Sequence, residues 1–377
     1  MRFLHTADWH LGRQLHSHPL LADQAEALEQ LLGWVEAHRV DAVLMAGDVY
    51  DRSVPPADAV TLLSDTLDRL CGTLNVPVVL IPGNHDSAER IGFASQQLAA
   101  AGVHVRATLE RALDPVVLRD AHGDIAVYAF PYTDPPAARA AFEVPFASHD
   151  AVLAYVCERA LADNPPGRRV VAMAHAFVDG GDASDSERPL SIGGSDRVEA
   201  QCFTGFDYAA LGHLHRPQAV GSNTVRYSGS LGKFSFSEVG HTKGAALVDM
   251  DATGEVSVTH LAFTPTRDLM RIEGYFDELI ASPCAAAREH YLTVRLLDRG
   301  AILDAMPRLR AVYPHVLHLE RPSFAPERNP TAPAVHRDHG VVPLFDSFMQ
   351  AVTGEALSAT ETAALAEVLD GMAREDR

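Results

Sequence analysis

The segment Asp41-Ala-Val-Leu-Met-Ala-Gly-Asp48-Val-Tyr-Asp51 joins an apolar run to a polar turn. Its centre, residues 43–45, predicts a buried strand because the run is short, apolar and bounded by a turn signal. Gly47 permits a sharp turn, so Asp48 should lie at the carboxyl end of the strand, where open α/β sheets keep their sites. A carboxylate there has two oxygens and can hold two metal ions. A single Gly-Asp pair is also ordinary turn chemistry, so the interpretation needs support from other residues.

Two other predicted strands are followed by a pair of side chains that point in one direction. Residues 2–6 are expected to form a strand that leads into Asp8-Trp-His10, and residues 207–211 one that leads into Gly-His213-Leu-His215. In extended backbone, residues i and i+2 project to the same side, so each pair can reach one cation. The two-histidine pair after a glycine is the stronger metal signal of the two.

Two further strands end in polar residues that suit the same chemistry. Residues 76–81 lead into Pro-Gly-Asn84-His85-Asp86, in which the Asn84 amide oxygen suits a hard cation and His85 can protonate a leaving oxygen. Residues 169–174 are a predicted strand that ends at His175. Each motif has an ordinary alternative when taken alone: Pro-Gly-Asn is common in β-turns, and a lone histidine is commonly a satisfied polar residue.

Together these residues predict a site for two metal ions. Asp8, His10, Asp48 and one histidine of the Gly-His-x-His motif can hold one ion, and Asp48, Asn84, His175 and the other histidine can hold the second. The mixture of carboxylate, amide oxygen and imidazole suits manganese, iron or zinc. Two such ions about 4 Å apart activate water and stabilise both oxygens of an in-line displacement at phosphorus.

Length, composition and charge argue against a membrane protein, a secreted protein and a protein that binds nucleic acid unaided. The 377 residues provide enough chain for two or three domains, and no long uncharged apolar run predicts a membrane span. The amino-terminal residues already carry a motif, so no signal peptide is expected, and the four scattered cysteines suit free thiols in a reducing cytosol. A net charge of −19 is unfavourable for unaided binding to nucleic acid.

The order of predicted elements defines the fold class. Strands alternate with helices early in the chain, including expected helices over residues 21–39, 88–101 and 149–162, and strands follow strands later, at 243–250 and 255–263. This order predicts an α/β fold, a two-layered β-sandwich flanked by helices, rather than a purely doubly wound sheet. A helix expected after Pro55-Pro56 has an apolar face that suits the core or part of a dimer surface.

The full motif series resembles the calcineurin-like metallophosphoesterase superfamily. The series is Asp8-x-His10, Gly47-Asp48-x-x-Asp51, Gly83-Asn84-His85-Asp86, His175 and Gly212-His213-x-His215. Within that superfamily, Thr6-Ala-Asp-Trp-His-Leu-Gly12 and Pro82-Gly-Asn-His-Asp86 resemble the bacterial SbcD nuclease subunits. The motif match spans residues 1–250. One departure is Ala174, since the superfamily commonly has glycine before this histidine.

The resemblance implies a role for each residue. The first metal would take Asp8, His10, Asp48 and His215, and the second Asp48, Asn84, His175 and His213. His85 would donate a proton and would be oriented by a neighbouring carboxylate, with Asp51 and Asp86 behind the ligands. The cofactors implied are two divalent ions, with Mn²⁺ expected.

The resemblance also implies substrate and partners. It points to hydrolysis of DNA phosphodiesters, as exonuclease or endonuclease, in DNA repair, recombination and replication. The partner would be an SbcC-like ATPase, bound by a homodimer of this chain within a heterotetramer in the cytoplasm. The alternatives are a small-molecule phosphodiesterase or phosphatase on the same fold, which would not need the last third of the chain, and a metal-free interaction scaffold, which would not need every ligand.

Four segments are expected along the chain: a nuclease domain at 1–265, a small α/β capping domain at 266–321, a proline-rich linker at 322–342 and helices at 343–377. The capping segment, with a helix expected over 301–312, has eight arginines and eight acidic residues between positions 267 and 321, so it is formally neutral. The C-terminal helices are expected to have apolar faces, because apolar residues recur at helical spacing and Ser358-Ala-Thr-Glu361 forms a capping box. These helices are expected either to dock on the ATPase or to fold back on the core.

Overall fold

A computed structural model describes residues 1–188, 197–322, 341–353 and 356–375 of the chain. The chain divides into two compact units, Met1–Leu269 and Met270–Arg377. Among the described residues, no helix is both long enough and apolar enough to cross a membrane. Most of the segment expected to be a linker, at 322–342, lies outside the described residues.

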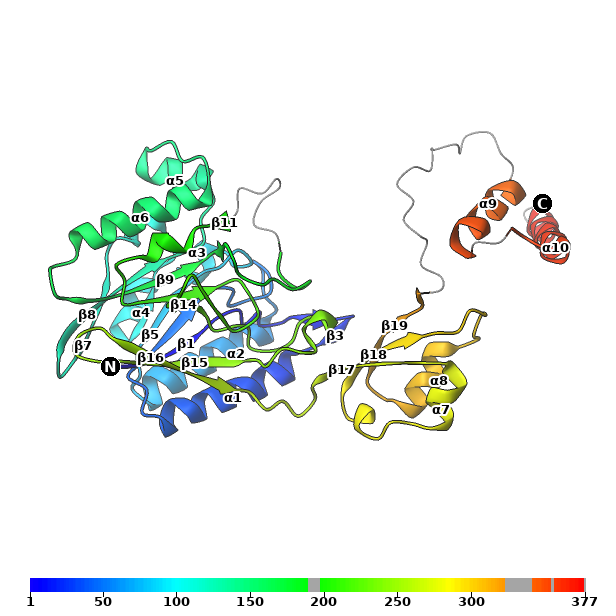
Figure 1. Ribbon diagram of the computed structural model, residues 1–377, viewed down its shortest axis with the longest axis horizontal. Helices are drawn as coiled ribbons and strands as arrows, with labels where there is room; N and C mark the ends of the chain where they lie inside the picture. Colours follow the sequence, from blue (N-terminus) through cyan, green and yellow to red (C-terminus); the bar gives the residue numbers. More distant parts are fainter. Residues whose placement is uncertain (189–196, 323–340, 354–355, 376–377) are drawn as a thin grey trace. The chain divides into compact units, whose positions relative to one another are not determined.

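The first unit contains a six-stranded sheet that carries the motif strand before Asp48 (Figure 1). Strands β1, β4, β5 and β6 of this sheet run parallel, and β15 and β16 add on antiparallel beside β1. In spatial order the strands are β16 (Val256–Ala262), β15 (Gly244–Met250), β1 (Arg2–Thr6), β4 (Ala42–Ala46), β5 (Val78–Ile81) and β6 (Val103–Val105).

A second six-stranded sheet in the same unit carries the remaining motif strands. Strands β14, β12, β9 and β8 run parallel, and an antiparallel strand closes each edge. In spatial order they are β13 (Gln218–Val220), β14 (Ser222–Tyr227), β12 (Tyr208–Gly212), β9 (Arg169–His175), β8 (Gly123–Phe130) and β7 (Val116–Asp120).

The two sheets form the two layers of a sandwich, because residues of both sheets contribute to one buried cluster between them. Along β4, Val43 and Met45 pack toward helices on the outside, whereas Leu44 packs in the cluster between the sheets. Alternate residues of β9 divide in the same way, with Met173 in the cluster between the sheets. Burial on both faces explains why the motif strands are continuous apolar runs, as buried parallel strands are. The predicted two-layered sandwich is confirmed.

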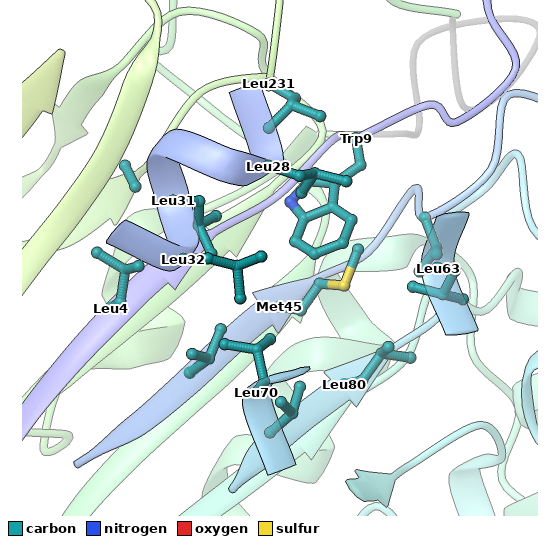
Figure 2. Packing of buried hydrophobic residues seen from close by; sticks show 14 of the residues in the cluster. Leu4, Trp9, Leu28, Leu31, Leu32, Met45, Leu63, Leu70, Leu80 and Leu231 are labelled. Atoms are coloured by element: carbon teal, nitrogen blue, oxygen red, sulfur yellow. The ribbon is translucent and has the colours of Figure 1, made fainter. Parts of the chain in front are cut away.

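Helices cover the outer faces of the sandwich (Figure 1). Residues Leu28, Leu31 and Leu32 of α1 pack around Trp9 and Met45 on the first sheet (Figure 2). The other sheet is covered in the same way by α6. The helices of this unit are α1 (Leu21–Ala37), α2 (Ala57–Leu67), α3 (Ala88–Ile91), α4 (Ser95–Ala100), α5 (Pro135–Phe142) and α6 (His149–Asp163).

The second unit contains a small three-stranded sheet and helices. Phe276, Leu292 and Tyr313 belong to its buried cluster. Helices α9 and α10 contact each other. The predicted capping box forms, because the Glu361 N–H donates to Ser358 Oγ at 3.3 Å and the Ser358 N–H donates to the Glu361 carboxylate at 2.9 Å. The elements are β17 (Leu269–Gly274), α7 (Phe276–Ala281), β18 (Tyr291–Leu296), α8 (Ala305–Val312), β19 (Val316–Glu320), α9 (Val341–Thr353) and α10 (Ala359–Glu375).

Two helix predictions were wrong in their extent. The helix expected over 88–101 is two short helices, because Ala94 between them has a φ of 55°, which no right-handed helix accommodates. The helix expected from residue 301 begins only at Ala305, after Asp304 at a φ of 50°. Strands β13, β14 and β17 and helices α5 and α7 were not anticipated.

Candidate metal centre

Five motif turns meet at one end of the sandwich. The turns after β1, β4 and β5 belong to the first sheet, and those after β9 and β12 belong to the second. All five follow the carboxyl ends of strands. Because the ends of both sheets meet there, side chains between positions 8 and 215 of the sequence become neighbours.

Main-chain hydrogen bonds join the turns after β1 and β4. The Asp8 N–H donates to the Gly47 carbonyl at 3.0 Å, and the His10 N–H donates to the Asp48 carbonyl at 2.9 Å. The second sheet joins through His213, whose N–H donates to both carboxylate oxygens of Asp8 at 3.0 and 3.1 Å. These four residues, Asp8, His10, Asp48 and His213, all have left-handed backbone, with φ of 53°, 45°, 49° and 111°.

Two motif glycines are required by close packing. A Cβ on Gly47 would overlap the His175 ring, and its φ of +93° already disfavours other residues. A Cβ on Gly83 would overlap the Asp48 carboxylate and backbone. The glycine before Asp48 and the glycine before Asn84 therefore let His175, Asp48 and the Asn84 turn approach each other.

Asp8, His10 and His215 form the first group of potential ligands, with one donor atom of each lying within 4.8 Å of the others. The Nε2 atoms of His10 and His215 are 3.1 Å apart, and Asp48 Oδ2 is 3.5 Å from His10 Nε2. The structure thus brings together the four residues expected around the first ion.

Asp8, Asp48 and His175 form the second group on the same distance criterion. His175 Nε2 is 3.6 Å from Asp48 Oδ2 and 2.9 Å from the Asn84 amide oxygen, and the His213 ring lies with its centroid 5.4 Å from that of His175. Ala174 before His175 does not keep this histidine out of the cluster. All seven predicted ligand residues therefore lie in one connected site.

The hydrogen-bond chemistry of the site fits divalent cations. His175 Nδ1 donates to the Ala46 carbonyl at 3.0 Å, so Nε2 presents a lone pair to the acceptor oxygens of Asn84 and Asp48. Burial, with Asp48 next in effect, raises the pKa of Asp8, and burial lowers the pKa of His10. Acceptor atoms that face one another, and buried carboxylates beside neutral imidazoles, suit a cation between them, and the donor set suits manganese, iron or zinc.

The His85 side chain lies beside this cluster but is oriented differently from expectation. Its Nδ1 donates to the main-chain carbonyl of Asp51 at 2.8 Å, so a carbonyl and not a carboxylate orients the ring. The Asp51 carboxylate instead lies 3.7 Å from His10 Nδ1 and accepts from Arg13 at 2.9 Å. His85 Nε2 points toward the ligands, 3.9 Å from Asp48 Oδ2.

Asp86 holds the turns together rather than facing a ligand. Its carboxylate accepts from the main-chain N–H groups of Gly83, Val49 and Tyr50 at 2.9 to 3.0 Å. Burial, followed by Asp48, raises the pKa of this carboxyl to about 7. The residue therefore links the turn after β5 to the turn after β4.

A buried network behind His215 was not predicted. Ser186 Oγ lies 2.5 Å from His215 Nδ1 and donates to Glu238 Oε1 at 2.7 Å, and Lys243 Nζ lies 3.3 Å from the same oxygen. Contacts with His215 and Lys243 outweigh burial and hold the pKa of Glu238 below its usual value. When Ser186 donates to Glu238, its oxygen is left to accept from His215 Nδ1–H, and His215 Nε2 then presents a lone pair to the cluster.

The position of this network explains why it was missed. Ser186 and Glu238 are 52 positions apart, and neither belongs to a local motif. The available signal was Lys243, one of two lysines in the chain, in a predicted strand where a buried lysine requires a carboxylate. Glu187, Glu238 and His215 also satisfy the distance criterion for a metal group, but Lys243 already supplies the positive charge there.

Two family models match parts of this chain. Residues 1–217 match the family described as calcineurin-like phosphoesterase, and residues 265–353 match a family described as type 5 capsule protein repressor C-terminal domain. A dimetal phosphatase from Danio rerio is 12% identical, covering 69% of this chain and 98% of its own, at a TM-score of 0.36.

Two curated relatives align over nearly the full length of this chain. The SbcD subunit of the nuclease SbcCD from Staphylococcus epidermidis is 30% identical over 364 residues, which is 96% of each chain. The protein of the same name from Staphylococcus saprophyticus is 31% identical over 387 residues, covering 100% of this chain and 99% of its own. The chain therefore belongs to the calcineurin-like phosphoesterase family and, within it, to the SbcD nuclease subunits.

Proposed function

We propose that the site holds two divalent metal ions, with Mn²⁺ as the working metal. The first ion is assigned to Asp8, His10, Asp48 and His215, and the second to Asp48, Asn84, His175 and His213. The observation that carries the proposal is the set of facing acceptor atoms, above all His175 Nε2 beside the Asn84 oxygen at 2.9 Å. When bound, such ions supply an activated water and neutralise charge on a phosphodiester.

The protein's own residues then perform three tasks. Asp48, between the two groups, positions both sets of ligands relative to each other. His85 is assigned as proton donor to the leaving oxygen, because its Nδ1–H is fixed on the Asp51 carbonyl and its Nε2 faces the cluster. Asp51, near His10 Nδ1, favours the tautomer of His10 that presents Nε2.

The proposed substrate is DNA, and the proposed partner is an SbcC-like ATPase. The name of the two relatives, which places them in a nuclease called SbcCD, supports both assignments. We assign the proposed reaction to DNA repair and recombination in the cytoplasm, performed by a homodimer of this chain within a heterotetramer. Residues 266–321 are assigned as the capping domain, and residues 343–377 as the ATPase-docking helices, with Phe345 and Phe348 exposed on α9.

The direct test is a cleavage assay on linear and hairpin DNA with and without manganese. The expected result is metal-dependent cleavage of both DNA and a small diester such as bis(4-nitrophenyl) phosphate. Hydrolysis of phosphomonoesters without cleavage of either diester would contradict the proposal.

A further inference from the structure

A polar cavity lies on the first unit and is lined in part by the residues that follow a proposed metal ligand in sequence. It has a volume of about 360 Å³, and Arg216 and Pro217, which directly follow His215, form part of its lining. Strand β14 contributes Arg226, and β16 contributes His260. Its size lies in the range of about 300–1,000 Å³ that is typical of small-ligand sites.

Two arginines, Arg216 and Arg226, carry the positive charge in the lining of this cavity, and no aspartate or glutamate is among its described lining residues. His241 and His260 also line it as neutral imidazoles, because burial lowers the pKa of both. The His241 Nδ1 is buried and has no hydrogen-bond partner within the described part of the chain. In a protein with a net charge of −19, a cavity of this composition selects for an anion.

The Arg226 side chain differs from several other cationic side chains of the first unit, because they have carboxylate partners. Arg13, Arg169 and Lys243 each bond or face a carboxylate, on Asp51, Asp120 and Glu238 respectively. The half-buried Arg226 guanidinium reaches only the Asn223 main-chain oxygen, at 3.5 Å, and no carboxylate bonds it in the described residues. A guanidinium presents a planar set of donors that matches two oxygens of a phosphate.

Arg216 is available to the same ligand. Its partner is Asp182 at 2.8 Å, and both side chains are more than half exposed. An exposed pair of this kind contributes about 0–1 kcal/mol, so a phosphate can replace the aspartate at little cost. The His215 carbonyl accepts from Lys243 Nζ at 2.7 Å, so the chain segment that leads from the metal site into the cavity is fixed in place.

We propose that this cavity binds a backbone phosphate of the nucleic-acid substrate, adjacent to the phosphodiester that is cut. The inference rests on the proposed function and adds to it a phosphate subsite centred on Arg226 and Arg216. It also supplies positive charge beside the metal centre, which a chain of net charge −19 needs in order to approach DNA.

The test compares two substrates in the full chain. Arg226→Gln, Arg226→Lys and Arg226→Glu are assayed on a single-stranded oligonucleotide and on bis(4-nitrophenyl) phosphate, whose single phosphate cannot occupy both sites at once. For Arg226→Gln, the ratio of kcat/KM on the oligonucleotide to kcat/KM on the small diester should fall about ten-fold, the loss expected for a charge-assisted hydrogen bond. The slope of log affinity against log salt should fall by about 1. Arg226→Lys should restore most of the ratio, and Arg226→Glu should lower it further.

The matched control is Arg119→Gln, which removes the same charge from an exposed position on β7. It should leave both the ratio and the salt slope at the wild-type values. An unchanged ratio and slope in Arg226→Gln, with a wild-type enzyme that cleaves both substrates, would refute the subsite alone. A different opposing result is that inorganic phosphate raises the thermal unfolding temperature of the wild type but not of Arg226→Gln, while the salt slope for the oligonucleotide is the same in both. That result would overturn the subsite for a substrate phosphate and indicate a site for free phosphate. If the wild-type enzyme cleaves neither substrate, the proposed function itself is refuted.

Discussion

Replacing Glu238 by glutamine tests whether the buried network behind His215 controls metal affinity. The carboxylate is fully buried and accepts from Ser186 at 2.7 Å, from Ser184 at 2.8 Å and from the Phe234 N–H at 2.6 Å, with Lys243 at 3.3 Å. An amide of the same shape places an N–H against at least one of these donors. It also leaves the Lys243 charge without its carboxylate.

Two effects of different size should follow. Lys243 is 4% exposed, so loss of its partner should lower the free energy of unfolding by about 3 kcal/mol or more. Ser186 would no longer be held as an acceptor for His215 Nδ1–H, and metal affinity should fall about 10- to 100-fold, as for other residues that orient metal ligands. Thermal unfolding in chelator measures the first effect, and calorimetric titration with Mn²⁺ measures the second.

A pair of serine variants separates stability from metal binding. Ser186→Ala removes the hydroxyl that touches His215 but leaves the Glu238–Lys243 pair, so it should cost about 1–2 kcal/mol of stability and still weaken manganese binding. Ser184→Ala removes a hydroxyl that bonds Glu238 at 2.8 Å but does not contact His215, so manganese affinity should stay near wild type. Equal manganese affinities in the two serine variants would refute the role of Ser186.

Further predictions follow from the same geometry. Asp48→Ala should lower metal content and diester hydrolysis together, and a variant that keeps two metals and normal turnover would refute the shared-ligand assignment. His85→Gln should keep its metals and lose about 100-fold or more in kcat, as for a lost general acid; loss of both metals would make His85 a ligand. Deletion of 343–377 should abolish co-purification with an SbcC-like ATPase, with diester hydrolysis as the check on folding; continued assembly would refute docking. The Arg169 guanidinium holds the pKa of the partly buried Asp120 carboxyl below its usual range, so this pair stabilises the fold above pH about 4 and loses that effect as pH falls through the lowered pKa. Asp120→Asn should cost about 2 kcal/mol at neutral pH and progressively less in acid; a constant difference across pH would contradict the assignment.

The sequence was sufficient to predict that the seven proposed ligand side chains lie close together, because its signals are local. Asp48 follows a recognisable strand and glycine, and the same is true of Asn84 and His213. Parallel strands bring such turns to one edge, so residues far apart in sequence can be placed together without knowledge of their contacts. The sandwich could be predicted for the same reason, from the order of strands and helices.

Features that depend on distant or main-chain contacts could not be predicted. The Ser186–Glu238 network joins two segments without local motifs, and the orientation of His85 depends on a carbonyl, which every residue has. The cavity around Arg226 lies on β14, a strand that was not anticipated. The break between α3 and α4 reflects the left-handed backbone of Ala94, a residue that ordinarily favours helix.

Left-handed backbone at the proposed site lowers the stability of the fold. The residues concerned are Asp8, His10, Asp48 and His213. Residues other than glycine cost about 1–3 kcal/mol each in such conformations, and the surrounding turns must supply that energy. A glycine in place of Asp48 would relieve the strain while removing the carboxylate between the two ligand groups. Glycine would therefore suit the backbone at these positions better, whereas the proposed metal chemistry needs aspartate and histidine there.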